Sequence, residues 1–303
     1  MTATAPAVTP AAVRPRGGRW QRHAPAALLL APLMAFMLIF YLIPIGQMVG
    51  ESLTYWSGDA VEDKATPTLY QYEKTLESSR ATGSIVRTFR ISLLSVAICF
   101  LLSYPIALWL LFAGRKLRTG VLLVVFISLA SSLIVRNYGW LVVLADGGPV
   151  NNLLIALGLT EFPLRLTYSE GAIITALVHY GMPFMILPIY GSLLRIPSSF
   201  WEASQSLGAT SMRTLWRVIL PLSMPGVFGG TMLVFAVSMS AFVTPLMLGS
   251  PSTAMVSQVA AEQLLVQLNF AWGSAIMTTL TVVTLAIVVL YALAVRKVFR
   301  VDV

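Results

Sequence analysis

Six long apolar runs constrain this chain more than any other feature of its sequence. Each run is free of Asp, Glu, Lys and Arg, and a helix needs about 20 mainly apolar residues to cross a bilayer. The runs lie within Ala24–Gly50, Ile91–Gly114, Thr119–Val135, Gly171–Leu194, Pro225–Leu248 and Ala275–Val295. Only 11% of all residues are charged, whereas soluble domains carry roughly a quarter. The sequence therefore predicts an all-α integral membrane protein with six transmembrane helices.

Two of these runs need a further interpretation. The first follows a basic leader, but it is too long for a signal peptide and no A-x-A-like cleavage site follows it, so we expect a retained span. The third is short, and we expect Arg136 behind it to extend to the membrane interface beside Tyr138 and Trp140. Between the last two runs, Gly249–Asn269 is more polar, which indicates a loop with a short helix.

The basic residues divide unevenly between the two sides of the membrane. The N-terminal tail, the loops 115–118 and 195–217 and the C-terminal tail together carry 13 basic and two acidic residues, whereas the other side carries 7 basic and 10 acidic residues. Cytoplasmic loops are enriched in Lys and Arg, so both termini are predicted to be cytoplasmic. The net charge of +8 follows mostly from this asymmetry. Because the cations lie in four short segments, they do not indicate nucleic-acid binding.

A cationic, amphipathic segment separates the fourth and fifth runs. Ser199, with Glu202 three residues later, predicts a capping box and a helix start. Gly208 fits the C′ position that ends such a helix. A second helix is predicted because apolar residues recur at helical spacing, at Met212, Leu215, Trp216, Ile219 and Leu220. Pro221 and Pro225 are expected to end it before the fifth span.

This segment has two physical interpretations. Its helices either lie on the anionic inner leaflet or dock on another protein. The pattern Glu202-Ala203, then Gly208, then Leu220-Pro221 resembles the EAA signature of binding-protein-dependent ABC importer permeases. The match departs from the signature at two positions, where Ser204 replaces an Ala and Val218 replaces an Ile.

The resemblance implies a type I (MetI-like) permease fold in the bacterial inner membrane. In that family the loop docks into a groove on an ATPase subunit, so Glu202, Ala203, Gly208, Leu220 and Pro221 are expected to couple the two chains. Trp201 and Leu207 are further expected contacts. The implied partners are two ATPase subunits, a second permease and a periplasmic solute-binding protein. Since the chain has no phosphate-binding G-x-x-x-x-G-K-[ST] motif, another chain must bind ATP, and no cofactor is expected.

Two further blocks resemble the spermidine/putrescine branch of these permeases. They are VRNYGWLVVLADGGPVNNLLIALGL (135–159) and HYGMPFMILPIYGSLLRIP (179–197). The likeness extends over roughly Gly83 to Val295 and favours a polyamine as the transported solute. Permeases for ferric iron, sulfate, opines or 4-aminobutyrate share much of this pattern, so these solutes remain alternatives.

The expected domain division follows from the apolar runs and from the resemblance to the permease family. Residues 1–23 form a basic cytoplasmic tail, residues 24–82 hold the first span and a periplasmic loop, and residues 296–303 form a second tail. The permease core is residues 83–295, with five spans and the coupling loop 195–222.

The transport pathway is expected along the fourth run. Pro183 and Pro188 predict irregular backbone there, and the candidate lining residues are His179, Tyr180, Met182 and Phe184. Aromatic rings would suit an ammonium group through cation–π contacts, although aromatic residues at this spacing also pack helices. With one cysteine and two histidines the chain offers no metal cluster and no catalytic set, so no enzyme is predicted. An ion-coupled secondary transporter is a weaker alternative. Such a transporter requires charged relays within its spans, and the first, second, fifth and sixth runs contain none.

Overall fold

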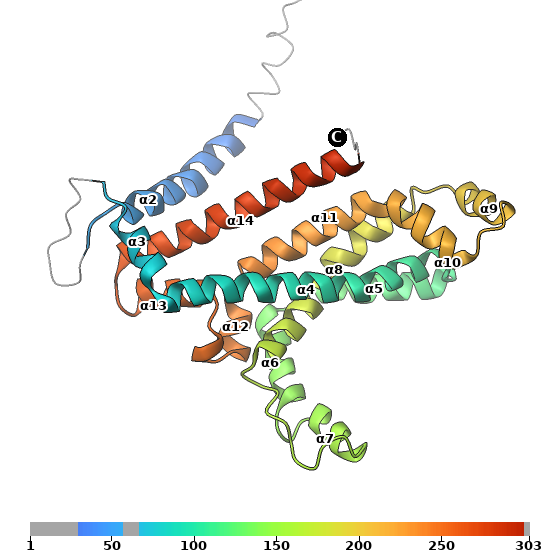
Figure 1. Ribbon diagram of the computed structural model, residues 1–303, viewed down its shortest axis with the longest axis horizontal. Helices are drawn as coiled ribbons and strands as arrows, with labels where there is room; N and C mark the ends of the chain where they lie inside the picture. The colour runs from blue at the N-terminus through green and yellow to red at the C-terminus, as the bar shows by residue number, and fades with distance from the viewer. Residues whose placement is uncertain (1–29, 57–66, 300–303) are drawn as a thin grey trace, which may run out of the picture. The chain divides into compact units, whose positions relative to one another are not determined.

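The computed structural model describes residues 30–56 and 67–299, and its regular elements are helices (Figure 1). The chain forms two compact units, residues 1–50 and 51–303. The predicted tail 1–23 lies outside the described residues, as do residues 300–303 of the predicted tail 296–303.

The first unit is a single apolar helix over its described residues. The helix is α-helical over residues 30–37, passes through the π-helical η1 (Leu38–Leu42) and continues as α2 (Ile43–Ser52), which ends two residues inside the second unit. Every large apolar side chain from Leu30 to Ile43 is at least half exposed within the chain. A helix that is apolar on all faces requires lipid or protein around it, which agrees with the predicted first span.

The second unit contains all the remaining helices of the described chain. In chain order they are α3 (Tyr70–Glu77), α4 (Ser79–Phe112), α5 (Arg115–Ala130), α6 (Leu133–Leu144), α7 (Pro149–Ala156), α8 (Glu170–Leu193), α9 (Ser198–Ser206), α10 (Ser211–Thr214), the π-helical η2 (Leu215–Ile219), α11 (Leu220–Met239), α12 (Val243–Leu248), the 3-10 turn η3 (Pro251–Thr253), α13 (Val256–Leu265) and α14 (Phe270–Phe299). The helix α13 lies where the sequence predicts a loop with a short helix.

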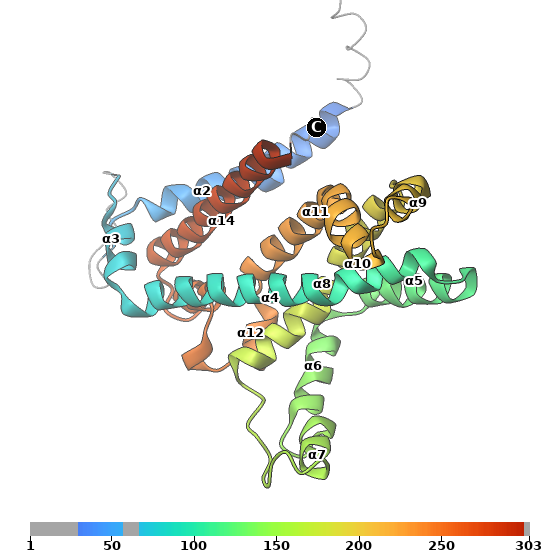
Figure 2. The same cartoon turned by 45° about the vertical axis from the view of Figure 1, so that its right-hand side comes forward.

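Six helical segments within the described ranges are long and apolar enough to cross a membrane, as predicted. The third span differs from its prediction. Thr119–Val135 is not one helix, because α5 ends at Ala130 and a new helix starts at Leu133. The third candidate span is instead Leu133–Ala156. The two serines between α5 and α6 adopt an extended backbone, and α6 leaves the line of α5 at a steep angle (Figures 1 and 2).

The helix α8 lies at the centre of the unit, packed between α4 and α11 (Figure 2). Small residues permit this packing. A Cβ atom added at Gly226 of α11 would lie 2.5 Å from the Cβ of Ser192, and one added at Gly230 would lie 3.2 Å from the Cα of Met185. Small residues in membrane helices let two backbones approach closely, which favours van der Waals packing where no water drives association.

The fifth span also differs from its prediction of Pro225–Leu248. One continuous helix runs from Ser211 to Met239, and it ends there before the separate short helix α12. Pro221 therefore does not end the preceding helix. Proline lacks the N–H that an α-helix requires, and the π-helical turn η2 directly before it has already changed the hydrogen-bond register, with the Leu220 N–H bonded to the Leu215 carbonyl.

Candidate coupling loop and pathway residues

The coupling loop, residues 195–222, begins with a helix whose start differs from the prediction. Pro197 has an extended backbone, and α9 begins directly after it at Ser198. Ser199 is therefore already helical, and no side-chain hydrogen bond caps the helix. The predicted capping box is wrong, because a capping side chain must come from the non-helical residue before the first turn.

The other end of α9 agrees with the prediction. Gly208 has a φ of +80°, a left-handed conformation that strains any residue with a Cβ. The Gly208 N–H donates to the Gln205 carbonyl over 2.8 Å, and the Ala209 N–H donates to the Ser204 carbonyl over 3.1 Å. These two bonds form a Schellman motif, which satisfies the free carbonyls of the last turn and reverses the chain sharply.

A side-chain hydrogen bond fixes α9 against the second helix of the loop. The Ser204 hydroxyl lies 2.9 Å from that of Thr214, which is fully buried. Thr210 caps α10 by accepting from the Arg213 N–H. Ser204 is one of the two positions that depart from the EAA signature, and sequence reasoning assigned it no role. Its hydroxyl has a partner that an Ala at that position would lack.

The predicted docking residues occupy different environments. Glu202 and Ala203 are exposed, and Leu207 at the tip of the loop is 89% exposed. Trp201 instead faces the membrane helices, where its ring centroid lies 5.6 Å from that of Phe112 at the end of α4. It lines, with Glu202, a cavity of about 450 Å³ between α4, α8 and the loop. Glu202 and Leu207 are thus accessible to another chain, whereas Trp201 packs against Phe112 at the end of α4.

The last two residues of the motif connect the loop to the membrane helices. Leu220 packs against the core formed by α4, α8 and α11. Pro221 is exposed in the first turn of α11. The second helix of the loop is therefore continuous with α11, because no break separates Ser211 from Met239.

The four candidate pathway residues lie on the middle of α8 and are partly buried. The Trp140 indole N–H donates to Nδ1 of His179 over 3.1 Å, so α6 occupies one side of this histidine. The rings of Tyr180 and Phe184 lie 5.5 Å apart, one helical turn from each other. Met182 and Phe184 pack against the hydrophobic core. His179 thus has a structural partner in Trp140. Tyr180 carries the second polar group of the four residues, its phenolic hydroxyl.

Arg136 does not extend to the interface as predicted. Its side chain is 9% exposed and folds back onto the end of α5, where it donates to the carbonyls of Ser128 and Ser131. Its guanidinium carbon lies 5.3 Å from the centre of the Tyr180 ring. The free carbonyls at a helix C-terminus attract a cation and accept hydrogen bonds from it. The break between α5 and α6 supplies those carbonyls, and hydropathy alone does not indicate this break.

Comparison with known proteins identifies this architecture. The sequence model of the family "binding-protein-dependent transport system inner membrane component" matches residues 23–299. The chain belongs to this family. Among curated relatives, the spermidine/putrescine transport system permease protein PotB of Haemophilus influenzae is 29% identical over 87% of this chain and 92% of its own length. PotB of Escherichia coli is 28% identical over 84% of this chain and 92% of its own length.

A solved structure agrees with the fold. A chain of a bacterial alginate ABC transporter, crystallised with an alginate-bound periplasmic protein, superposes with a TM-score of 0.78 at 19% identity and covers 94% of this chain and 98% of its own. The family and the curated relatives make this permease a multi-pass protein of the bacterial inner membrane, and the solved structure agrees with the predicted MetI-like fold.

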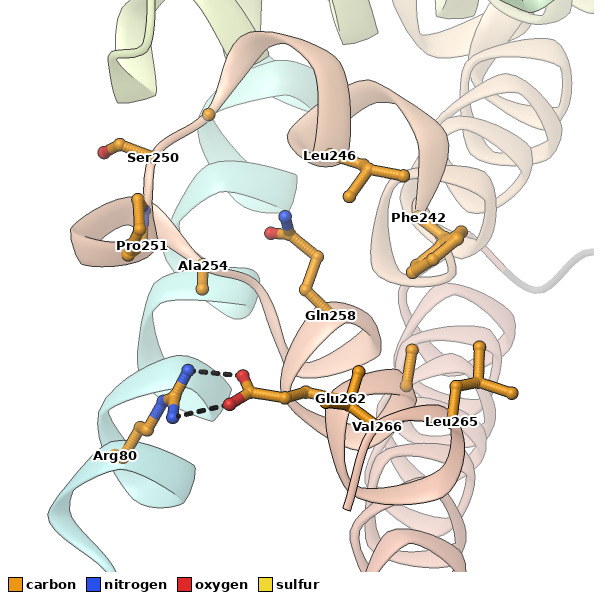
Figure 3. Close-up of a pocket in the computed structure, with 12 residues that line it drawn as sticks. Arg80, Phe242, Leu246, Ser250, Pro251, Ala254, Gln258, Glu262, Leu265 and Val266 are labelled. Carbon is orange, nitrogen blue, oxygen red and sulfur yellow. Dashed lines mark hydrogen bonds and ion pairs between the residues drawn. The ribbon is translucent and has the colours of Figure 1, made fainter. Parts of the chain in front are cut away.

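The end of the permease opposite the coupling loop is held by ion pairs. Arg80 of α4 makes a bidentate pair with Glu262 of α13, with the shorter bond at 2.5 Å (Figure 3). The pair forms one wall of a groove of about 420 Å³ between α4, α12 and α13. Arg87 and Arg90 both pair with Glu170 at the start of α8. Glu262 is therefore paired with a cationic side chain of α4.

Proposed function

We propose that this permease imports a polyamine of the spermidine/putrescine class, using ATP hydrolysed by separate subunits. The observation that supports the solute is the similarity to PotB proteins over most of both chains. The rings of Tyr180 and Phe184 supply aromatic faces to which an ammonium group binds. We place His179 and Met182 beside them in the same pathway.

The partners follow from the family and from one solved relative. We propose that two ATPase subunits dock on the coupling loops of this chain and of a second permease. A periplasmic binding protein delivers the solute, as the alginate transporter is crystallised with its own periplasmic protein. Both termini and the coupling loop then face the cytoplasm, in line with the positive-inside rule.

The mechanical role of the loop rests on its stiffness. In our proposal the ATPase contacts Glu202, Ala203 and Leu207, and the Schellman turn at Gly208 keeps their orientation fixed. The Ser204–Thr214 bond passes the force to α10. Leu220 and Pro221 pass it to α11, and Trp201 buttresses the loop against α4.

We also propose that the chain is divided into functional segments as its sequence predicts. Residues 24–82 supply the first span and an outer segment, and residues 83–295 supply the permease core with the coupling loop 195–222. Within the described residues the only regular element of the outer segment between α2 and α4 is α3.

A charge argument favours a second class of solute. The uncharged runs 91–112, 171–193, 218–239 and 275–295 contain no carboxylate, and the guanidinium carbon of Arg136 lies 5.3 Å from the centre of the Tyr180 ring. A polyamine would need carboxylates from the second permease to balance its charge. A solute with its own carboxylate, such as 4-aminobutyrate or an opine, would instead be attracted by Arg136.

One experiment separates these solutes. The complex is purified through this chain, its binding protein is identified, and that protein is titrated by calorimetry with putrescine, spermidine and 4-aminobutyrate. Tight binding of a polyamine, with polyamine-stimulated ATP hydrolysis in proteoliposomes, is the expected result. Binding of 4-aminobutyrate alone would replace the polyamine by the second solute, and transport without ATP would favour an ion-coupled carrier.

A further inference from the structure

The helix that follows the tip of the coupling loop has an outward face that no part of the described chain covers. Met212 and Trp216 are 62% and 63% exposed, and the residue that follows each of them, Arg213 and Arg217, is also exposed. We name these four residues the outward face of α10–η2. The other side of the same helix is buried, with Thr214 at 0% and Ile219 at 4% exposure. Neither arginine forms an ion pair with a described carboxylate.

The length of the helix fixes the depth of this face in the membrane. The helix is continuous from Ser211 to Met239, and its uncharged part, residues 218–239, is about 33 Å long at 1.5 Å per residue. The hydrocarbon core of a bilayer is about 30 Å thick. When residues 218–239 fill the core, Arg217, Trp216 and Arg213 lie within the first two turns beyond it, at the level of the headgroups.

The chemistry of the face matches that layer. A guanidinium group binds phosphate oxygens through two parallel hydrogen bonds, and an indole ring prefers the membrane interface. We infer that the outward face of α10–η2 binds the phosphate groups of anionic lipids in the leaflet on its side of the membrane. The leaflet is the cytoplasmic one if the orientation given under Proposed function holds.

The first helix of the loop has the opposite character. Glu202 is an exposed carboxylate on α9, and an anionic surface repels it. In this inference the two helices have different partners. The helix α9 contacts the ATPase, and α10–η2 binds lipid and so anchors the loop to the membrane. The Ser204–Thr214 bond joins the two parts.

The test uses the fluorescence of Trp216 in the full chain, purified with its associated subunits and placed in nanodiscs. The difference in emission between the wild type and Trp216→Phe isolates this indole from the other six tryptophans of the chain. Quenching is compared between nanodiscs that contain brominated phosphatidylglycerol and nanodiscs that contain brominated phosphatidylcholine. We expect quenching by both lipids, with phosphatidylglycerol the stronger quencher.

Removal of the charges should abolish the preference. The variant Arg213→Gln/Arg217→Gln should lower the phosphatidylglycerol preference by roughly fivefold or more, the change expected for one or two arginines at an anionic surface. The matched control is Arg165→Gln, which removes an exposed arginine before α8, at the opposite end of that helix from the coupling loop. It should leave the preference unchanged.

Three outcomes overturn the inference. The first is a Trp216 signal that brominated lipid does not quench in the complex but that a soluble quencher reaches once the ATPase subunits are removed, which would assign the face to the ATPase. The second is equal quenching by the two lipids in the wild type. The third is an unchanged preference in the double variant. Because the assay needs no transport, it stands even if the proposed solute is wrong.

Discussion

The coupling loop connects α8 to α11 in sequence, but the loop and the α8–α11 pair differ in how they are stabilised. Where Gly226 of α11 meets Pro188 and Ser192 of α8, an added Cβ atom has no space. At Gly208 in the loop, an added Cβ atom would meet nothing within 4 Å, and only the backbone angle selects glycine. One region is specified by close packing and the other by local backbone geometry and by side-chain hydrogen bonds such as the Ser204–Thr214 bond and the Thr210 cap.

The difference shows how an importer can combine a stable membrane core with an accessible docking element. The core transmits motion because its helices cannot separate without losing their contacts. The loop exposes Glu202 and Leu207 because the hydrogen bonds of α9 and its C-terminal turn, rather than burial, maintain the shape of this first helix. The two regions should therefore respond differently to substitutions of similar size.

The largest effect is expected at the packed interface. Gly226→Ala places a methyl group against the Pro188 carbonyl oxygen and 2.5 Å from the Cβ of Ser192. Overpacking of this kind costs about 1–3 kcal/mol, so the melting temperature of the purified complex should fall. The matched control is Gly229→Ala, where the nearest atom would be at 3.9 Å. That variant should be neutral or more stable, and equal destabilisation of both would break the comparison.

A smaller loss is expected at the tip of the loop. Gly208→Ala must hold a left-handed backbone, at a cost of about 1–2 kcal/mol, with no steric clash elsewhere. Gly208→Asn should retain more function, because asparagine tolerates this conformation. Membrane abundance should stay normal while solute uptake is lost in the alanine variant. Full uptake by Gly208→Ala would show that the turn does not set the docking geometry.

The bond between the two loop helices should contribute less. Ser204→Ala leaves the Thr214 hydroxyl without its partner, and a hydrogen bond of this type contributes about 0.5–1.5 kcal/mol. A double-mutant cycle with Thr214→Val measures the coupling directly. We also expect more ATP hydrolysed per solute transported, since a looser joint transmits less motion. A coupling energy near zero would remove the bond from the proposed force path.

The smallest change in stability is expected at Glu202. Its side chain is exposed and caps nothing, so Glu202→Gln should change the free energy of unfolding by less than about 0.5 kcal/mol. Uptake should nevertheless be lost if the carboxylate contacts the ATPase. Glu161→Gln, at another exposed glutamate, is the control for loss of charge. A normal rate of uptake in Glu202→Gln would argue against the coupling role.

Much of this fold could be predicted because the membrane imposes it. Charge-free length determines where a helix can span, and α8 and α14 lie where the sequence predicts them. The breaks were not predictable. The α5–α6 break lies in a run that is apolar on both sides, and hydropathy does not distinguish a bent helix from a straight one. The π-helical turn before Pro221 was not predictable for the same reason.

The candidate site divides along similar lines. The spacing of the loop motif and the need for glycine at position 208 are local properties, and the structure agrees with them. The inward turn of Trp201 towards Phe112, and that of Arg136 towards Tyr180, depend on partners far away in sequence. No local pattern carries that information.

By itself the sequence determined where six helices can cross a membrane and that a sharply bent segment follows the fourth of them, since both follow from the polarity and backbone freedom of neighbouring residues. Only the tertiary structure decided which side chains of that segment remain available to partners. It also decided that a buried guanidinium lies beside the Tyr180 ring. The physical reason is that burial and pairing are set by contacts between distant helices, and those contacts exist only once α8 lies between α4 and α11.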